Sequence, residues 1–353
     1  MIALALVAAT LAGRHEFHEI HMGVQVRVVL HAESADQAAA AARIAFDRVR
    51  AWDDALSDWR PDTPAQNLPS RAGETQRVEG ALRRALEASR RLGQRTAGGF
   101  EAGLGSLTRL WRDARRTGNM PQDNAITAAL ACSGRQAWDW NPAESLFIAR
   151  RDGVRMDFGA IGQGLAADDA LSALREAGFP QALVDVSGDI AIGDAPPGEP
   201  GWRIEIAPAT DGRQPETLTL HDTAISTSGD AAQATNVSGG VVGHLIDPAS
   251  GRPLPSPRQA TVIASDAATA DAVATALCTL PMREAMMVAK DATIAARIDR
   301  CPEEGGIREL GRWPELRRAS SGPAGGSTAP EARHPSPAPA ASDPPGSPPR
   351  PST

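Results

Sequence analysis

The sequence predicts an α+β fold, in which strands and helices interleave without the regular spacing of a doubly wound sheet. Residues 24–30 alternate polar and branched apolar side chains, which is typical of a strand. Residues 34–56 place apolar side chains at helical spacing after Ser34, a good N-cap, and indicate a long helix. Because further elements follow at irregular intervals, mixed sheets flanked by helices are a better prediction than repeated βαβ units.

The rest of the chain follows the same mixed pattern. Helical periodicity predicts helices at 79–92, at 165–177 and at 269–280. Gly178 ends the second of these, because glycine readily takes the left-handed conformation found after a helix C-terminus. Runs rich in branched residues predict strands at 182–186, 202–206 and 260–264. The stretch from Asp123 onward is poorly patterned.

Composition is that of an ordinary globular protein and narrows the classes of function. The chain has 353 residues, of which 42 % are hydrophobic and 22 % charged, enough for one large core or two domains. The formal net charge of −7 argues against a nucleic-acid partner. The 3 cysteines form no CxxC pair, so neither a zinc site nor a redox motif is expected.

The two ends of the chain differ from its middle. Residues 1–12 form a short apolar run ending in small residues, as in the signal peptide of an exported protein; a buried first strand or helix is the alternative. The run is too short to span a membrane, which needs about 20 apolar residues. Residues 320–353 are rich in Pro, Ala, Ser and Gly and cannot bury enough apolar surface to fold, so a disordered tail is expected.

A glycine-rich segment follows Asp157. Gly159, Gly162 and Gly164 precede the helix expected at 165–177. Glycine allows a ligand to approach the backbone closely, and the start of a helix offers free N–H groups to a phosphate. The segment therefore indicates a phosphate-binding turn, with an ordinary strand-turn-helix connection as the alternative.

Asp271 and Thr275 form a candidate metal site. They lie four residues apart on the helix expected at 269–280, so both side chains project from one face. A carboxylate and a hydroxyl are hard oxygen donors that suit Mg²⁺. The alternative is an alanine-rich helix whose early aspartate complements the helix dipole.

The segment from His244 to Gly251 combines a histidine with a turn. Asp247-Pro248, followed by Gly251, is favourable turn chemistry. His244 lies three residues before Asp247, near the same corner, and a histidine can take a proton from a hydroxyl near neutral pH. The alternative is a surface turn with an incidental histidine.

Taken in order, these segments resemble the ApbE family of flavin transferases. Residues 270–276 are similar to the family pattern Ala-Asp-Ala-x-x-Thr-Ala, and residues 244–251 to His-x-x-Asp-Pro-x-Ser/Thr-Gly. Residues 157–168 match the family's glycine-rich segment in part. The resemblance covers about residues 16–312, which are therefore the expected FMN transferase domain with an ApbE-like fold.

The resemblance implies roles for individual residues. Magnesium would be held by the backbone carbonyl of Gly162 and the side chains of Asp271 and Thr275, and His244 would be the catalytic base. The flavin-binding residues would be Met22, Trp59, Gly99, Phe100, Glu101, Asp157, Ser228, Gly229, Asp230, Ile246 and Asp247.

The implied activity is the Mg²⁺-dependent transfer of FMN from FAD to a threonine or serine of an acceptor protein, with release of AMP. The implied acceptor is a flavin-carrying electron-transfer subunit outside the cytoplasm, which agrees with the apolar start. Gln163, Glu101 and Ala231 stand where the family has lysine, aspartate and an aromatic residue. These departures leave three alternatives open: an FAD pyrophosphatase with water as acceptor, a protein that binds FAD without turnover, and a degenerate scaffold.

Overall fold

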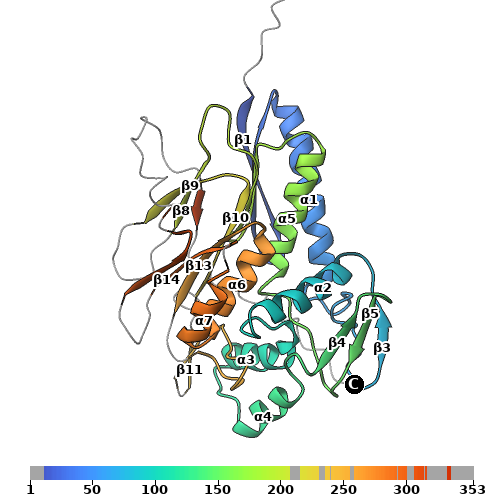
Figure 1. Cartoon of the computed structure of the whole chain (residues 1–353). Coiled ribbons are helices and arrows are strands. Elements are labelled where there is room, and N and C mark those ends of the chain that lie inside the picture. Colours follow the sequence, from blue (N-terminus) through green and yellow to red (C-terminus); the bar gives the residue numbers. More distant parts are fainter. Residues whose placement is uncertain are drawn as a thin grey trace, which may run out of the picture.

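The computed structural model contains an eight-stranded antiparallel sheet with further layers on both faces (Figure 1). The structure describes residues 12–206, 215–229, 235–238, 240–254, 258–291, 293–299, 306–313, 315 and 332–334. The strands follow the order β1-β2-β6-β7-β10-β13-β14-β15. Their bounds are β1 Gly13–His21, β2 Val24–Ala32, β6 Ala182–Val186, β7 Asp189–Ile192, β10 Thr223–Gly229, β13 Gln259–Ala264, β14 Ala295–Asp299 and β15 Ile307–Gly311.

Helices cover one face of this sheet (Figure 1). α1 (Ala35–Leu56) lies over β1 and β2, and α5 (Gly162–Glu176) lies over β6 and β7. α6 (Ala267–Thr279) lies over β10 and β13, while α2 (Gly80–Arg95) contacts both α1 and α6. The main hydrophobic core fills the space between these helices and the sheet.

α1 shows how a local signal and packing combine. Ser34 accepts a hydrogen bond from the backbone N–H of Gln37 at 3.3 Å, which satisfies one of the donors left free at the helix start. Its buried face includes Ala45, Val49 and Trp52 at helical spacing. Because burying a large apolar side chain contributes roughly 1.5–3 kcal/mol, packing on the sheet holds this helix more than propensity does.

A small sheet covers part of the opposite face. Its strands follow the order β16-β8-β9, with bounds β8 Trp202–Ile206, β9 Glu216–Leu220 and β16 Ala332–His334. Trp202, Ile204 and Leu218 are buried in a second core that they share with Ile190 and Ile225 of the main sheet. The main sheet is thus buried on both sides where the two sheets overlap.

The remaining elements surround the helical side of the molecule. They are β3 Thr75–Arg77, η1 Ala102–Leu104, α3 Gly105–Thr117, α4 Asp123–Ala131, β4 Trp138–Asn141, β5 Leu146–Ala149, β11 Thr235–Val237, β12 Gly240–Val242 and α7 Met282–Val288. β3, β5 and β4 form one small sheet, and β11 and β12 form another. A third core, which includes Leu107, Trp111, Ile126 and Ile246, joins α3 and α4 to the chain that follows β12.

The α+β fold and every helix and strand predicted from the sequence are confirmed, with ends shifted by a few residues. α5 begins at Gly162, three residues before the predicted start, and α6 begins at Ala267, two residues early. The stretch from Asp123 onward, poorly patterned in the sequence, contains α4, which begins at that residue. Ile126 is the single buried residue of α4, so this helix has no apolar stripe to reveal it in the sequence.

The ends of the chain are only partly described. Residues 1–11 of the expected signal peptide lie outside the described residues, as does most of the expected disordered tail. The tail residues Ala332–His334 form β16 beside β8, which differs from the disorder expected for them. Within the described part of the chain, no helix has the length and apolar content needed to cross a membrane.

Candidate functional site

The predicted metal ligands lie where α5 and α6 cross. A Cβ atom built on Gly164 would lie 2.6 Å from the carbonyl group of Ala267, so glycine is needed for the two backbones to approach this closely. The Gly164 N–H donates a hydrogen bond to the carboxylate of Asp271. Gly162 opens α5, and Asp271 and Thr275 lie about one turn apart on α6. The crossing therefore brings the start of α5 to the predicted ligand face of α6.

Asp271 is buried and only partly satisfied. The residue is 5 % exposed, and its Oδ2 atom has no hydrogen-bond partner. Burial raises the pKa of Asp271 well above its ordinary value, and the carboxylates of Asp189 and Asp168 raise it further. Thr275 is also buried and shares a hydrogen bond of 3.0 Å with the hydroxyl of Ser228 on β10. Because an unsatisfied buried acceptor costs about 1–3 kcal/mol, Asp271 favours a bound cation or proton.

This set of donors fits magnesium. A carboxylate, a hydroxyl and a backbone carbonyl are hard oxygen ligands, and Mg²⁺ usually takes one or two carboxylates together with water and substrate phosphate. Across the described residues, no group of three or more histidine, cysteine or acidic side chains could hold a metal ion. A site with a single carboxylate agrees with that finding, because its other ligands would be hydroxyl, backbone and substrate oxygens.

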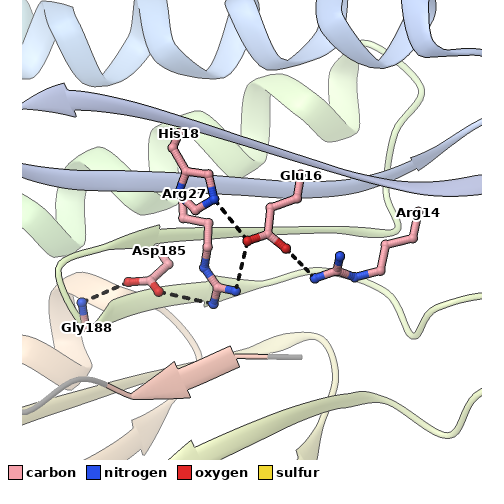
Figure 2. A network of polar contacts seen from close by, with 6 residues as sticks. All are labelled: Arg14, Glu16, His18, Arg27, Asp185 and Gly188. Carbon is pink, nitrogen blue, oxygen red and sulfur yellow. Dashed lines mark hydrogen bonds and ion pairs between the residues drawn. The ribbon is translucent and has the colours of Figure 1, made fainter. Parts of the chain in front are cut away.

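A charged network that runs across β1, β2 and β6 holds the neighbouring turn (Figure 2). Arg27 pairs with Glu16 at 3.8 Å and with Asp185 at 3.2 Å. Asp185 also accepts a hydrogen bond from the Gly188 N–H at 2.8 Å. Figure 2 shows that Arg14 and His18 flank the Glu16 carboxylate. The network thus fixes the connection between β6 and β7.

This connection places a second buried carboxylate. Ser187 adopts a φ of +57°, a left-handed conformation that is uncommon for serine, and the chain then enters β7 at Asp189. Asp189 is buried and accepts a hydrogen bond from the hydroxyl of Ser226 at 2.6 Å. Burial, followed by the charges of Asp185 and Asp168, raises the pKa of Asp189 to about 7. The region around Asp271 therefore concentrates negative charge in a dry environment.

The hairpin tip between β1 and β2 presents Met22 to the start of α5. Met22 has a φ of +52° and Gly23 a φ of +73°, the signs of a type I′ turn, in which methionine is strained. The Met22 N–H donates to Asp53 Oδ2 of α1 at 2.9 Å, which holds the strained turn. A Cβ atom built on Gly162 would lie 3.4 Å from Met22 Cε. The structure therefore brings two predicted site residues, Met22 and Gly162, together.

Trp59 covers the same hairpin tip. A Cβ atom built on Gly23 would lie 3.3 Å from the Trp59 ring, yet this tryptophan is 55 % exposed. An indole and a thioether are both suited to contact with a flat aromatic ring. Met22 and Trp59 thus form an apolar wall beside the start of α5.

α3 organises the predicted segments on the other side of the site. Arg112 of α3 pairs with Asp58 at 2.5 Å, immediately beside Trp59 in the chain. Burial raises the pKa of Asp58, and the nearby Asp157 carboxylate raises it further. Asp157 itself accepts a hydrogen bond from the Gly159 N–H at 2.7 Å and so shapes the predicted glycine-rich turn. The Gly105 N–H at the start of α3 donates to the Arg155 carbonyl at 3.0 Å, so α3 contacts both the Trp59 segment and the chain that leads into Asp157.

The same helix anchors the segment that contains His244. Arg115 donates to the Gly243 carbonyl at 3.1 Å, directly before the half-buried His244. Trp111 Nε1 donates to the Gly251 carbonyl at 2.7 Å. The predicted base is thus held between two contacts with α3, one on each side along the chain.

Asp247 closes the turn that follows His244. Its carboxylate accepts hydrogen bonds from the Ala249 N–H at 2.9 Å and from the Ser250 hydroxyl at 2.6 Å. Ile246 is buried in the core around α3, so its side chain supports the turn from below. An open cavity of about 420 Å³ lies between this turn and Glu101. The predicted turn is confirmed, and Asp247 has a defined structural part in it.

The Gly99-Phe100-Glu101 segment is held by structural contacts. Phe100 is 1 % exposed and belongs to the main core. The Gly99 carbonyl accepts a hydrogen bond from the Thr279 hydroxyl at 2.7 Å, which docks the segment on the end of α6. The Glu101 carboxylate accepts from the N–H two residues along the chain at 2.7 Å and from Trp138 Nε1 at 2.9 Å. These three residues hold the backbone of this segment in place beside the site, and their predicted flavin contacts stay predictions.

The end of β10 carries the last predicted contacts. Ser228 reaches Thr275, and a Cβ atom on Gly229 would lie 3.1 Å from the backbone of Gln259 on β13. Asp230 lies outside the described residues. β10 therefore contributes the hydroxyl of Ser228 to the site, and Gly229 allows the backbones of β10 and β13 to approach closely.

Sequence reasoning missed two groups that shape the site. Asp168 of α5 hydrogen-bonds to the first backbone N–H groups of α6, about 100 residues away in the chain. Arg112 of α3 lies beside Asp58 at the site's edge. No local pattern marks such long-range partners; the one available signal was that Asp168 ends the glycine-rich segment 157–168, whereas Arg112 lies in no segment singled out from the sequence.

Comparison with known proteins identifies the class. A model of the ApbE family matches residues 22–298, most of the chain, and the protein therefore belongs to the ApbE family. The chain is 26 % identical over 280 residues to an FAD:protein FMN transferase of Rhodobacter capsulatus, which covers 77 % of this chain and 52 % of the relative. It is 28 % identical over 250 residues to an FAD:protein FMN transferase of Klebsiella pneumoniae (strain 342), a match that covers 68 % of this chain and 71 % of that relative. The match thus spans about half the length of the first relative.

The fold is also that of solved ApbE structures. The crystal structure of the ApbE protein from Thermotoga maritima is similar with a TM-score of 0.77 at 22 % identity. The similarity covers 87 % of this chain and 100 % of that protein. The predicted ApbE-like architecture is therefore confirmed.

Proposed function

We propose that this protein transfers FMN from FAD to a threonine or serine hydroxyl of an acceptor protein in a Mg²⁺-dependent reaction that releases AMP. The observation that carries the proposal is the buried Asp271 carboxylate, whose Oδ2 atom lacks a hydrogen-bond partner at the α5–α6 crossing. Membership of the ApbE family and relatives named FAD:protein FMN transferase support it.

The site offers two complementary surfaces to FAD. Met22 and Trp59 form an apolar wall that suits the planar rings of the dinucleotide. The start of α5, opened by Gly162, carries the positive end of a helix dipole, which suits the pyrophosphate. In the proposal the rings lie along the wall and the pyrophosphate lies at the helix start.

Asp271, Thr275 and the Gly162 carbonyl are the proposed magnesium ligands. When bound there, Mg²⁺ neutralises charge on the pyrophosphate and so stabilises the charge that develops in phosphoryl transfer. The concentration of carboxylates around Asp271 favours a divalent cation for the same electrostatic reason. Gly164 and Ser228 hold Asp271 and Thr275 in place through hydrogen bonds.

His244 is the proposed base. It accepts the proton of the acceptor hydroxyl as the oxygen forms a bond to the FMN-side phosphorus, and the anhydride bond to AMP breaks. The contacts of Arg115 and Trp111 on either side of His244 fix the segment on α3. A base held in place in this way is more effective than a mobile one, because it must lie within hydrogen-bond reach of the proton it takes.

We further propose export and an electron-transfer subunit as acceptor. The apolar run at residues 1–12 supports export, and the remaining tail would extend from the catalytic domain as a disordered segment. Determination of the amino-terminal sequence of the mature protein tests export. A mature chain that begins shortly after Ala12 supports the proposal, and recovery of Met1 or Ile2 in the cytoplasm contradicts it.

The experiment that tests the activity follows AMP release from FAD in MgCl₂ and in EDTA. We expect release with MgCl₂ in the presence of an acceptor protein and none in EDTA. Undiminished release in EDTA contradicts the metal assignment. The variant Asp222→Asn is the control: it changes only an exposed ion pair with Arg175, so it should respond to MgCl₂ and EDTA as the wild type does.

A further inference from the structure

α5 and α6 exchange carboxylate contacts with each other's backbone. The carboxylate of Asp271 on α6 accepts the N–H of Gly164 on α5. In return, Asp168 on α5 accepts the N–H of Ala267 at 2.7 Å and the N–H of Ala268 at 3.0 Å on α6. This reciprocal pair joins the two helices at the point where their backbones touch.

Asp168 is not needed merely to cap α6. Asp266 already acts as the local N-cap, with its carboxylate accepting the Thr269 N–H at 2.8 Å. Asp168 instead comes from another helix and satisfies the two N–H groups that precede Thr269. Both of its oxygens are used, which fixes the position of α6 along α5 as well as its distance.

The spacing of these residues couples the contact to the proposed metal site. Asp168 lies one turn after Gly164 on α5, and Asp271 lies one turn after Ala267 on α6. A movement of α6 along α5 would therefore shift Asp271 relative to Gly162. The Gly164 contact alone fixes how closely the helices approach, whereas Asp168 also fixes their register.

We propose that Asp168 is a positioning residue that sets the register between α5 and α6 and thereby the affinity of the site for Mg²⁺. The inference rests on the proposed function, because Gly162, Asp271 and Thr275 are the proposed ligands. Residues that orient metal ligands from behind typically change metal affinity 10–100-fold when they are replaced. Asparagine cannot replace the carboxylate fully, since its amide nitrogen would face one of the two N–H donors.

The test compares Asp168→Asn with Asp169→Asn by titrating each protein with MgCl₂ and following urea unfolding. Asp169 is the next residue of the same helix, and its carboxylate pairs with Arg84 at 2.7 Å and accepts from Trp52 Nε1 at 3.1 Å. Loss of Asp169 therefore removes an ion pair of α5 without touching α6. We expect Asp168→Asn to need at least about tenfold more Mg²⁺ than the wild type for the same gain in the free energy of unfolding, and Asp169→Asn to match the wild type.

Equal Mg²⁺ affinity in folded Asp168→Asn and in the wild type overturns the inference. If Asp168→Asn does not fold, Asp168→Glu is measured in the same way, because it keeps the charge but displaces the carboxylate by one methylene. Wild-type affinity in Asp168→Glu also overturns the inference, and a loss of affinity in that variant supports it. A wild-type protein that gains no stability from MgCl₂ contradicts the proposed metal site itself, so the two failures are distinguishable.

Discussion

Replacing Asp271 with asparagine separates a metal ligand from an ordinary buried polar residue. The substitution keeps the size of the side chain and the oxygen that accepts the Gly164 N–H, but it removes the charge. In the absence of metal, the wild-type carboxylate is held near Asp168 and Asp189 with its pKa raised by burial. Because asparagine relieves that repulsion, metal-free Asp271→Asn should be at least as stable as the wild type at pH 8.

Magnesium should reverse this order. A ligand at 100 times its dissociation constant stabilises the folded state by about 2.7 kcal/mol. The wild type should gain that amount in the free energy of unfolding, and Asp271→Asn should gain almost none, because the only charged proposed ligand is gone. Transfer of FMN should be lost with it.

Urea unfolding at pH 8 in EDTA and in saturating MgCl₂ measures both quantities. Asp222→Asn is the matched control, because it makes the same chemical change at an exposed ion pair. A full Mg²⁺ response in Asp271→Asn, or a marked loss of stability in EDTA, would refute the reasoning and leave Asp271 as a structural residue of α6.

Three further outcomes are expected. In EDTA, the free energy of unfolding should fall as the pH rises from about 4 to about 7. Burial raises the pKa values of Asp168 and Asp189 from 3.8 to about 7, so the folded chain binds more protons than the unfolded chain over that interval. Urea unfolding across pH checks this, and stability that rises over the interval contradicts it. His244→Asn should leave FAD affinity, measured by fluorescence, nearly unchanged and lower the rate of FMN transfer by roughly 10²–10⁴; weaker FAD binding with an unchanged saturated rate would make His244 a binding residue. Gly164→Ala should cost about 1–3 kcal/mol of stability, because the new Cβ atom would meet the Ala267 backbone at 2.6 Å; a urea midpoint equal to that of the wild type would show that the helices can separate freely.

Local signals in the sequence predicted the elements that carry the site. The apolar periodicity of 269–280 predicted α6 and placed Asp271 and Thr275 on one face, because helical spacing is a property of neighbouring residues. α4 escaped prediction because Ile126 alone is buried and no stripe develops. The sequence therefore predicts a helix or strand where the buried residues of one segment repeat at a regular spacing.

Contacts between distant segments could not be predicted in this way. Asp168 meets Ala267 about 100 residues further along the chain, and nothing near Asp168 indicates that partner. Met22 was assigned by resemblance, yet its strained φ and its bond to Asp53 appear only in three dimensions. For Glu101 the flavin contact implied by the resemblance stays a prediction, and the two protein hydrogen bonds that its carboxylate accepts could not be read from the sequence.

The stoichiometry of the reaction tests the central claim most directly. Purified protein is incubated with FAD, MgCl₂ and a threonine-containing acceptor domain, and AMP, free FMN and the mass of the acceptor are measured in the same sample. FMN transfer predicts one AMP for each acceptor that gains one FMN, with little free FMN. AMP accompanied only by free FMN would identify a pyrophosphatase, and bound FAD without AMP would identify a binding protein; either result contradicts the account.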